Sequence, residues 1–196
     1  AVNCISVLIN SVASFGLENL NKHYAEQTYS LLLPKFKLND IDQELKVSLV
    51  VAVGYLIIHL GHYLKNENLV TIFDIYYEKN SNENLRSLIF SLLSKTLKSK
   101  KIDLSPYMIK YVDYILKHAL KFNIQVQYQS LELLLTIIKF APSCISSQSS
   151  LCNSINEAVI ALACEDSLVA IVYEILLGLW SSAWNVFLGT SWFACK

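Results

Sequence analysis

Residues 40–54 read Asp40-Ile-Asp-Gln-Glu-Leu-Lys-Val-Ser-Leu-Val-Val-Ala-Val-Gly54, and this stretch decides the fold. Asp42 can accept hydrogen bonds from the free backbone N–H groups of a first helical turn. From Leu45 onward, apolar residues recur at intervals of three and four, a pattern typical of a helix with one buried face. The stretch therefore predicts an α-helix that begins just after Asp42.

The same pattern occurs four times along the chain. Aligned on one apolar residue, the copies are spaced by 40, 41 and 42 residues; the aligned residues are Leu45, Leu85, Val126 and Leu168. Three positions earlier, the first three copies carry good N-capping residues: Asp42, Asn82 and Asn123. The fourth copy offers Glu165-Asp166, a looser match. A recurring capped helix predicts an array of similar units.

Another apolar-periodic stretch precedes each of these helices, and a first helix is expected near residues 5–15. The preceding stretches lie at 24–36, 69–77, 106–122 and 155–164. Ser105-Pro106 predicts a helix start, Pro142 a helix end, and Pro34 a kink or an early end. Glycine and proline are scarce and no alternating strand pattern occurs, so the fold class is all-α.

A unit of helix, short capped turn and helix, about 40 residues long, is the design of HEAT and armadillo arrays. The pattern of residues 31–54 is closest to HEAT. The 196 residues therefore predict one α-solenoid of about five HEAT repeats. Its expected parts are a partial repeat at 1–22, repeats at 23–62, 66–102, 105–142 and 153–180, and a divergent apolar tail at 181–196.

The composition excludes some classes of protein. Hydrophobic residues make up 54% of the chain, charged residues only 16%, and the formal net charge is zero. Intrinsic disorder needs low hydrophobicity and high net charge, so it is excluded. A neutral chain with Arg86 as its one arginine offers no general attraction for phosphates, so no nucleic-acid partner is expected.

The apolar excess fits a solenoid, because each repeat hides apolar faces against the next and the end repeats expose theirs. All three tryptophans lie near the C-terminus. We expect this end either to fold back on itself or to self-associate through its aromatic residues: Trp180, Trp184, Phe187 and Trp192.

No catalytic, cofactor or metal site is predicted. The five cysteines are too widely spaced for paired zinc knuckles, and they indicate buried reduced thiols in a protein of the cytoplasm and nucleus. His59 and His62 could share a metal, but imidazoles at a helix C-terminus are the favoured interpretation. The nucleotide-binding, hydrolase and metalloprotease motifs are absent from the sequence, so no enzyme is expected.

One polar position recurs at repeat spacing, as Lys46, Arg86 and Gln127. These side chains could form a strip that faces a partner, but pairing with the acidic turns of adjacent repeats, such as Asp40 and Asp42, is favoured. Lys95 opens a basic turn that ends at Lys101. The candidate partner-binding residues are Gln43, Lys46, Arg86, Lys95, Gln127 and Gln129.

A membrane anchor is a distant alternative. Residues 168–190 carry one acidic side chain and are long enough to cross a bilayer. The first part of this segment fits the repeat register, and its glycines and serines indicate helix ends within it. We therefore expect solenoid helices here and no membrane partner.

Several motifs resemble the central solenoid of the cullin-associated, neddylation-dissociated family, also called TATA-binding-protein-interacting. The resemblance covers about residues 24–177 in one register, and after Gly178 it fades. It is carried by Asp40-Ile-Asp-Gln-Glu-Leu-Lys46, Val53-Gly-Tyr-Leu-Ile-Ile-His-Leu-Gly61, Lys101-Ile-Asp-Leu-Ser-Pro106 and Ser130-Leu-Glu-Leu-Leu-Leu-Thr-Ile-Ile138.

The resemblance implies a fragment of a long, non-catalytic superhelix that wraps a cullin and its RING subunit. Such proteins bind cullins that lack the ubiquitin-like modifier and promote exchange of substrate-receptor modules during ubiquitin-ligase (SCF) assembly. The main alternative is a HEAT scaffold of another class, a transport receptor or a phosphatase scaffold. These would need acidic inner loops or tryptophan ladders at repeat spacing, which the sequence lacks.

Overall fold

The computed structural model describes residues 18–36, 42–64, 82–99, 103–118, 121–146, 149–162 and 168–180, and all regular elements in these ranges are helical. This confirms the all-α prediction. The elements are α2 (Glu18–Phe36), α3 (Gln43–Leu60), the 3₁₀ turn η1 (Gly61–Tyr63), α5 (Glu83–Ser99), α6 (Ser105–His118), α7 (Ile124–Phe140), α8 (Ser143–Ser146), α9 (Ser149–Leu162) and a last helix, Val169–Trp180.

The chain divides into two compact units, Ala1–Asp103 and Leu104–Lys196. Each is described by itself below. The single array of about five HEAT repeats stays a prediction. The expected helices at 5–15 and 69–77, the capping pair Glu165-Asp166 and the tail 181–196 lie outside the described residues.

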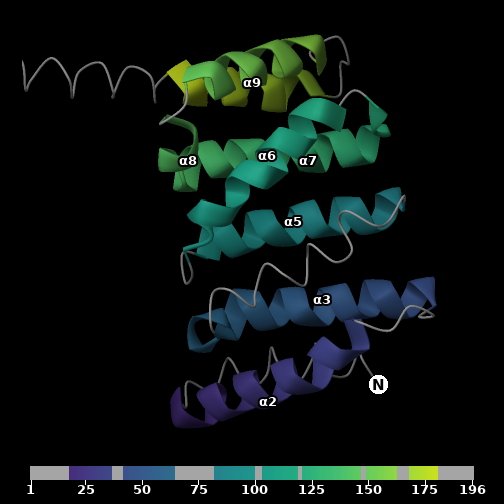
Figure 1. The fold of residues 1–196 in the computed structure, drawn as a ribbon. Coiled ribbons are helices and arrows are strands. Elements are labelled where there is room, and N and C mark those ends of the chain that lie inside the picture. Colours follow the sequence, from purple (N-terminus) through teal and green to yellow (C-terminus); the bar gives the residue numbers. More distant parts are fainter. Residues whose placement is uncertain are drawn as a thin grey trace, which may run out of the picture. The chain divides into compact units, whose positions relative to one another are not determined.

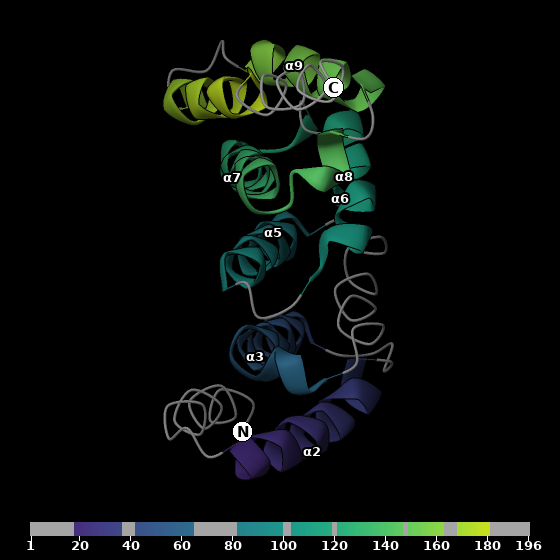
Figure 2. The same cartoon turned by 90° about the vertical axis from the view of Figure 1, so that its left-hand side faces the viewer.

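Three helices stack in the first unit, where α3 packs between α2 and α5 (Figure 1). Figure 2 looks almost along the axes of both α3 and α5. The buried side of α3 is continuous, because its buried residues follow the helical period: Leu49, Val50, Ala52, Val53, Leu56, Ile57 and Leu60.

On α2, Tyr29 is buried, and this burial raises the pKa of its phenol above the ordinary value.

Gly54 sets how closely α3 approaches α5. A Cβ atom at this position would lie 2.6 Å from both Cδ atoms of Leu92, inside the distance that carbon atoms tolerate. The absence of a side chain at residue 54 therefore lets Leu92 pack directly against the α3 backbone.

The predicted N-caps are confirmed for the three repeats that the structure describes there. Asp42 Oδ1 accepts from the backbone N–H of Gln43 at 2.8 Å. Asn82 Oδ1 accepts from Asn84 N–H at 2.9 Å, and Asn123 Oδ1 accepts from Val126 N–H at 2.9 Å. Each cap satisfies a backbone donor that the first helical turn leaves free.

Replacing Asn123 by alanine should therefore destabilise the second unit. The Val126 N–H loses its acceptor, and capping substitutions of this kind cost about 0.5–2 kcal/mol. Urea unfolding followed by tryptophan fluorescence measures the loss, since every tryptophan lies in this unit. Asn123→Asp keeps an acceptor and serves as the control. Equal midpoints for the alanine variant and the wild type would contradict the role of the cap.

In the second unit, α6 packs against α7, α8 and α9 (Figure 1). The Cys144 thiol on α8 donates a hydrogen bond to the Ser105 carbonyl at the start of α6, with an S···O distance of 3.0 Å. The last helix packs on α7, because a Cβ atom at Gly178 would lie 2.9 Å from Cγ2 of Ile138. An ion pair of 2.9 Å between Lys139 and Glu174 joins the same two helices at the surface.

The helix boundaries follow two of the three prolines and differ elsewhere. α7 ends before Pro142 and α6 begins at Ser105, as expected. Pro34 lies inside α2, which continues two residues past it, so the early helix end considered there is not observed. However, α2 and α9 begin six residues earlier than the apolar period indicates, at Glu18 and Ser149. Apolar periodicity marks only the buried part of a helix, so it misses polar first turns.

By length and composition alone, the segment Gln43–Tyr63 could cross a membrane, and half of it is buried inside the protein. It consists of α3 and η1, and α3 packs against both α2 and α5. The segment expected as the membrane candidate, 168–190, is described only as far as Trp180, and this part contains the helix Val169–Trp180. Residues 181–190 lie outside the described residues.

Candidate partner-binding surface

The recurring polar position occupies the same place in three helices. The backbone N–H of Lys46 donates to the Asp42 carbonyl at 3.0 Å, that of Arg86 to Asn82 at 3.2 Å, and that of Gln127 to Asn123 at 2.9 Å. Each residue therefore closes the first turn after its cap. All three side chains are half-buried. Lys46, Arg86 and Gln127 thus occupy the same position relative to the start of their helices, as predicted, in α3 and α5 of the first unit and in α7 of the second.

Lys46 has no acidic partner among the described residues. The ion pairs described there are Lys117–Asp113 at 2.6 Å and Lys139–Glu174 at 2.9 Å, with all four side chains more than half exposed. Asp42 uses its carboxylate on the backbone of α3. No ion pair between Lys46 and Asp42 is described, and the predicted contribution of Asp40 lies outside the described residues.

Two glutamines in the predicted set hold partly buried amides. Gln43 Nε2 and Gln129 Oε1 are buried and have no hydrogen-bond partner in the described part of the protein. Leaving such an atom unsatisfied costs about 1–3 kcal/mol. Gln43 stands at the start of α3 and Lys46 three residues later, so the two belong to one surface at the N-terminal end of that helix.

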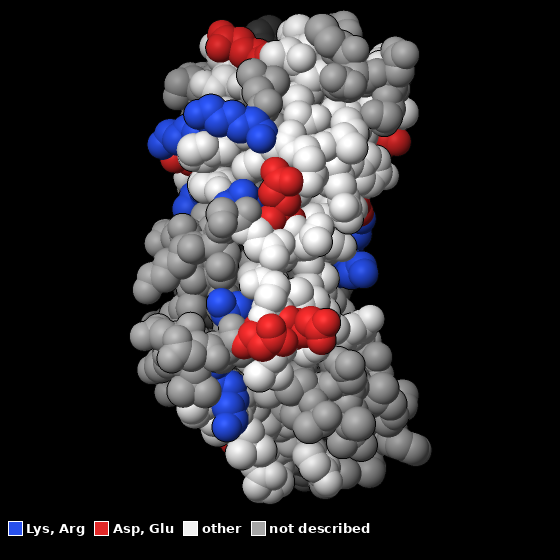
Figure 3. Space-filling view, turned by 90° about the vertical axis from the view of Figure 1, so that its right-hand side faces the viewer, with Lys and Arg blue, Asp and Glu red and all other residues white. Residues whose placement is uncertain are grey.

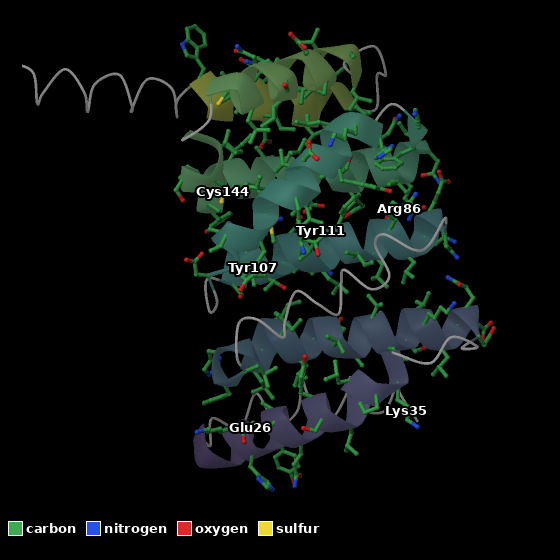
Figure 4. All side chains as sticks on the ribbon, in the orientation of Figure 1. Glu26, Lys35, Arg86, Tyr107, Tyr111 and Cys144 are labelled. Carbon is green, nitrogen blue, oxygen red and sulfur yellow. The ribbon has the colours of Figure 1, made fainter. Side chains whose placement is uncertain are left out.

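Lys95 does not belong to this surface. It is exposed near the C-terminal end of α5, nine residues from Arg86, which Figure 4 labels near the other end of the helix. Nine residues of helix span about 13 Å. A lysine in this place also interacts favourably with the partial negative charge of the helix C-terminus. The candidate residues of the first unit are thus Gln43, Lys46 and Arg86, with Lys95 separate.

Charges of both signs lie among uncharged side chains on the face drawn in Figure 3. Basic and acidic groups form small separate clusters there, and neither sign covers a broad area of the described atoms. Such a mixed surface suits a protein partner with charges of both signs better than a polyanion.

The histidines lie where the sequence predicts, at the C-terminal end of α3. The ring of His59 stacks on Tyr55 with centroids 6.0 Å apart, and His62 packs on Tyr63 at 3.9 Å. Among the described residues, no group of three or more His, Cys, Asp or Glu side chains could hold a metal ion. Of the two described cysteines, both free thiols, Cys144 is buried as predicted and Cys152 is half-buried.

The prediction from sequence missed part of an apolar surface on the last helix. Val169, Tyr173, Leu177 and Trp180 follow one another at helical spacing, and all are exposed. We call these four residues the C-terminal stripe. Of these four, the sequence singled out only Trp180, as part of an aromatic surface that folds back on itself or self-associates. The repeat register aligns Tyr173 with the buried residues Val50, Phe90 and Leu131, so the exposure of this stripe depends on what packs against it.

Comparison with known proteins gives one partial similarity. The chain is 35% identical over 86 residues to "Cullin-associated NEDD8-dissociated protein 1" from Drosophila melanogaster, a match that covers 43% of the chain and 7% of that protein. No family model matches the chain, and no solved structure matches it. The chain thus spans a small part of its relative's length, and the match is shorter than the resemblance seen over residues 24–177. It supports a distant, HEAT-like relationship to a cullin-associated protein.

Proposed function

We propose that this chain is a segment of a non-catalytic HEAT-repeat scaffold that binds cullin–RING ubiquitin ligases. The observation that carries the proposal is the 35% identity over 86 residues to a protein whose name associates it with cullins. Helices that begin after a capping residue and recur about every 40 residues support it, because arrays of this kind present long surfaces to protein partners.

In this proposal the protein acts by wrapping its partner. Each repeat contributes a few weak contacts, and their sum gives the affinity of the whole scaffold. A cullin held in this way excludes competing substrate-receptor modules by steric overlap, so that receptors exchange during SCF assembly. The RING subunit lies within the wrapped complex. Such a protein works in the cytoplasm and nucleus, where the ubiquitin-conjugation pathway operates.

The N-terminal ends of α3 and α5 are proposed as this segment's contribution. Lys46 and Arg86 occupy equivalent positions there, and Gln43 offers a buried amide donor with no described acceptor. A carboxylate on the partner could pair with the Lys46 ammonium group, since charge-assisted hydrogen bonds are stronger than neutral ones. In α7, Gln127 occupies the position that corresponds to Lys46 and Arg86, Gln129 lies two residues further on, and Lys95 adds a separate basic contact.

Titration of the 196-residue chain against an unmodified cullin–RING complex tests the proposal. We expect weak binding, with a Kd of about 10 µM to 1 mM, because most of the scaffold's contacts are missing. Lys46→Glu combined with Arg86→Glu should weaken it about tenfold or more, since rim charges are reversed. Nuclear magnetic resonance titration measures affinities in this range.

Two comparisons sharpen the experiment. Lys117→Glu reverses an exposed charge on α6 that is already paired with Asp113, and it should leave binding nearly unchanged. A cullin that carries the ubiquitin-like modifier should bind more weakly than the unmodified one. Equal binding to both cullins, no binding at 1 mM, or a nanomolar complex with this segment alone would each contradict the proposal.

A further inference from the structure

The C-terminal stripe differs sharply from the same positions of the preceding helices. Tyr173 aligns with Val50, Phe90 and Leu131, all fully buried, yet it is 63% exposed. Trp180 aligns with Ile57, Leu97 and Ile138, which are at most 5% exposed, yet it is 70% exposed. A position that is buried in three helices and exposed in the fourth indicates that a packing partner of the fourth helix is missing from the described residues.

Two contacts identify which neighbour is missing. In the first unit, Gly54 of α3 contacts Leu92 of α5, the corresponding helix of the next repeat. In the second unit, Ile138 of α7 contacts Gly178 of the next such helix. The register positions of Gly54 and Ile138 therefore face forward along the array. In the last helix these positions are Leu177 and Trp180, so the stripe is a forward face without a described helix on it.

We propose that residues 181–196 of the same chain fold back over the C-terminal stripe and cover it. This segment follows Trp180 directly, and its only charged side chain is Lys196. Four of its large apolar residues are spaced by three and four, namely Trp184, Phe187, Leu188 and Trp192, while Val186 and Phe193 fall outside this spacing. That spacing gives a helix one apolar face, as the stripe requires. This inference does not depend on cullin binding.

Length and tethering favour this segment over a second copy of the chain. Ser181-Ser182-Ala183 leaves a three-residue connection, which is enough to join two antiparallel helices. The twelve residues from Trp184 to Cys195 are then enough to reach along the stripe, because its described helix, Val169–Trp180, rises only about 18 Å. A short connection also gives the segment a millimolar effective concentration, which a second copy reaches only in concentrated solution.

Hydrogen exchange of the full 196-residue chain, combined with light scattering, tests the proposal. We expect the wild type to be a monomer. Phe187→Ser with Trp192→Ser should accelerate amide exchange of residues 169–180 about tenfold or more, because a large apolar cover is lost. Tyr173→Ser with Leu177→Ser should accelerate exchange of residues 184–195 to a similar extent. The variant with all four substitutions should exchange hardly faster than either double variant, because both pairs of substitutions disrupt the same interface.

The control is Ile109→Ser on α6, an exposed apolar residue of the same unit outside the stripe. It should change neither exchange pattern. Because the stripe residues are exposed on their own helix, their substitution should also leave the helical circular dichroism signal intact. A dimeric wild type would assign the stripe to a second copy and overturn the proposal. Unchanged exchange of residues 169–180 in the Phe187 and Trp192 variant would overturn it as well.

Discussion

Replacing Gly54 by leucine is expected to destabilise the first unit by about 1–3 kcal/mol, the usual cost of overpacking a close-packed core. A Cβ atom alone would already come within 2.6 Å of Leu92, and three further carbons have little free volume beside this neighbour, which is only 3% exposed. Leucine favours helix over glycine by slightly less than 1 kcal/mol, which offsets only part of this cost. Urea unfolding followed by circular dichroism measures the change.

A double-mutant cycle connects the effect to Leu92. Leu92→Ala alone should cost about 2–5 kcal/mol, because it leaves a cavity between α3 and α5. Combined with Gly54→Leu, it should cost clearly less than the sum of the two, since the new side chain fills the vacated space. Gln27→Leu, at an exposed position of α2, is the control and should stay within about 0.5 kcal/mol. Additive effects of the two changes would contradict a direct contact.

Replacing Tyr111 by alanine is expected to have the largest effect in the second unit, about 3–5 kcal/mol. Tyr111 is fully buried on α6, and this helix packs against α7, α8 and α9. The free energy of unfolding falls for two reasons: the transfer energy of the aromatic ring is lost, and the cavity that it leaves is only partly filled. Urea unfolding of the full chain, followed by tryptophan fluorescence, gives the difference.

Tyr107 offers a matched control for this substitution. It lies one turn before Tyr111 on the same helix (Figure 4) and is only half-buried. Tyr107→Ala therefore removes the same atoms from a more exposed site, and it should cost clearly less. An equal loss of stability in both variants would contradict the deeper burial of Tyr111.

Prediction from the sequence worked best where the physical cause is local. The caps at Asp42, Asn82 and Asn123 were predicted because an Asx side chain reaches only the next few backbone amides. The end of α7 followed from Pro142 for the same reason. The polar starts of α2 and α9 were missed, since the apolar period that locates a helix is present only where the helix is buried.

The candidate site was predicted less completely. The equivalence of Lys46 and Arg86 followed from the repeat spacing, and the structure confirms it. The favoured pairing of Lys46, Arg86 and Gln127 with the acidic turns of adjacent repeats stays a prediction, because Asp40 lies outside the described residues and the one described contact of the Asp42 carboxylate is with the backbone of α3. The exposure of Tyr173 and Leu177 could not be read from composition, because it depends on what packs against them.

The sequence by itself therefore determined the fold class, the period of the helices and the caps that begin three of them. These properties come from interactions between residues a few positions apart. Only the tertiary structure decided the division into two units, the close approach of Leu92 to Gly54 and the bare forward face of the last helix. Burial is a relation between segments distant in the chain, so the same apolar residue is core in one repeat and surface in another.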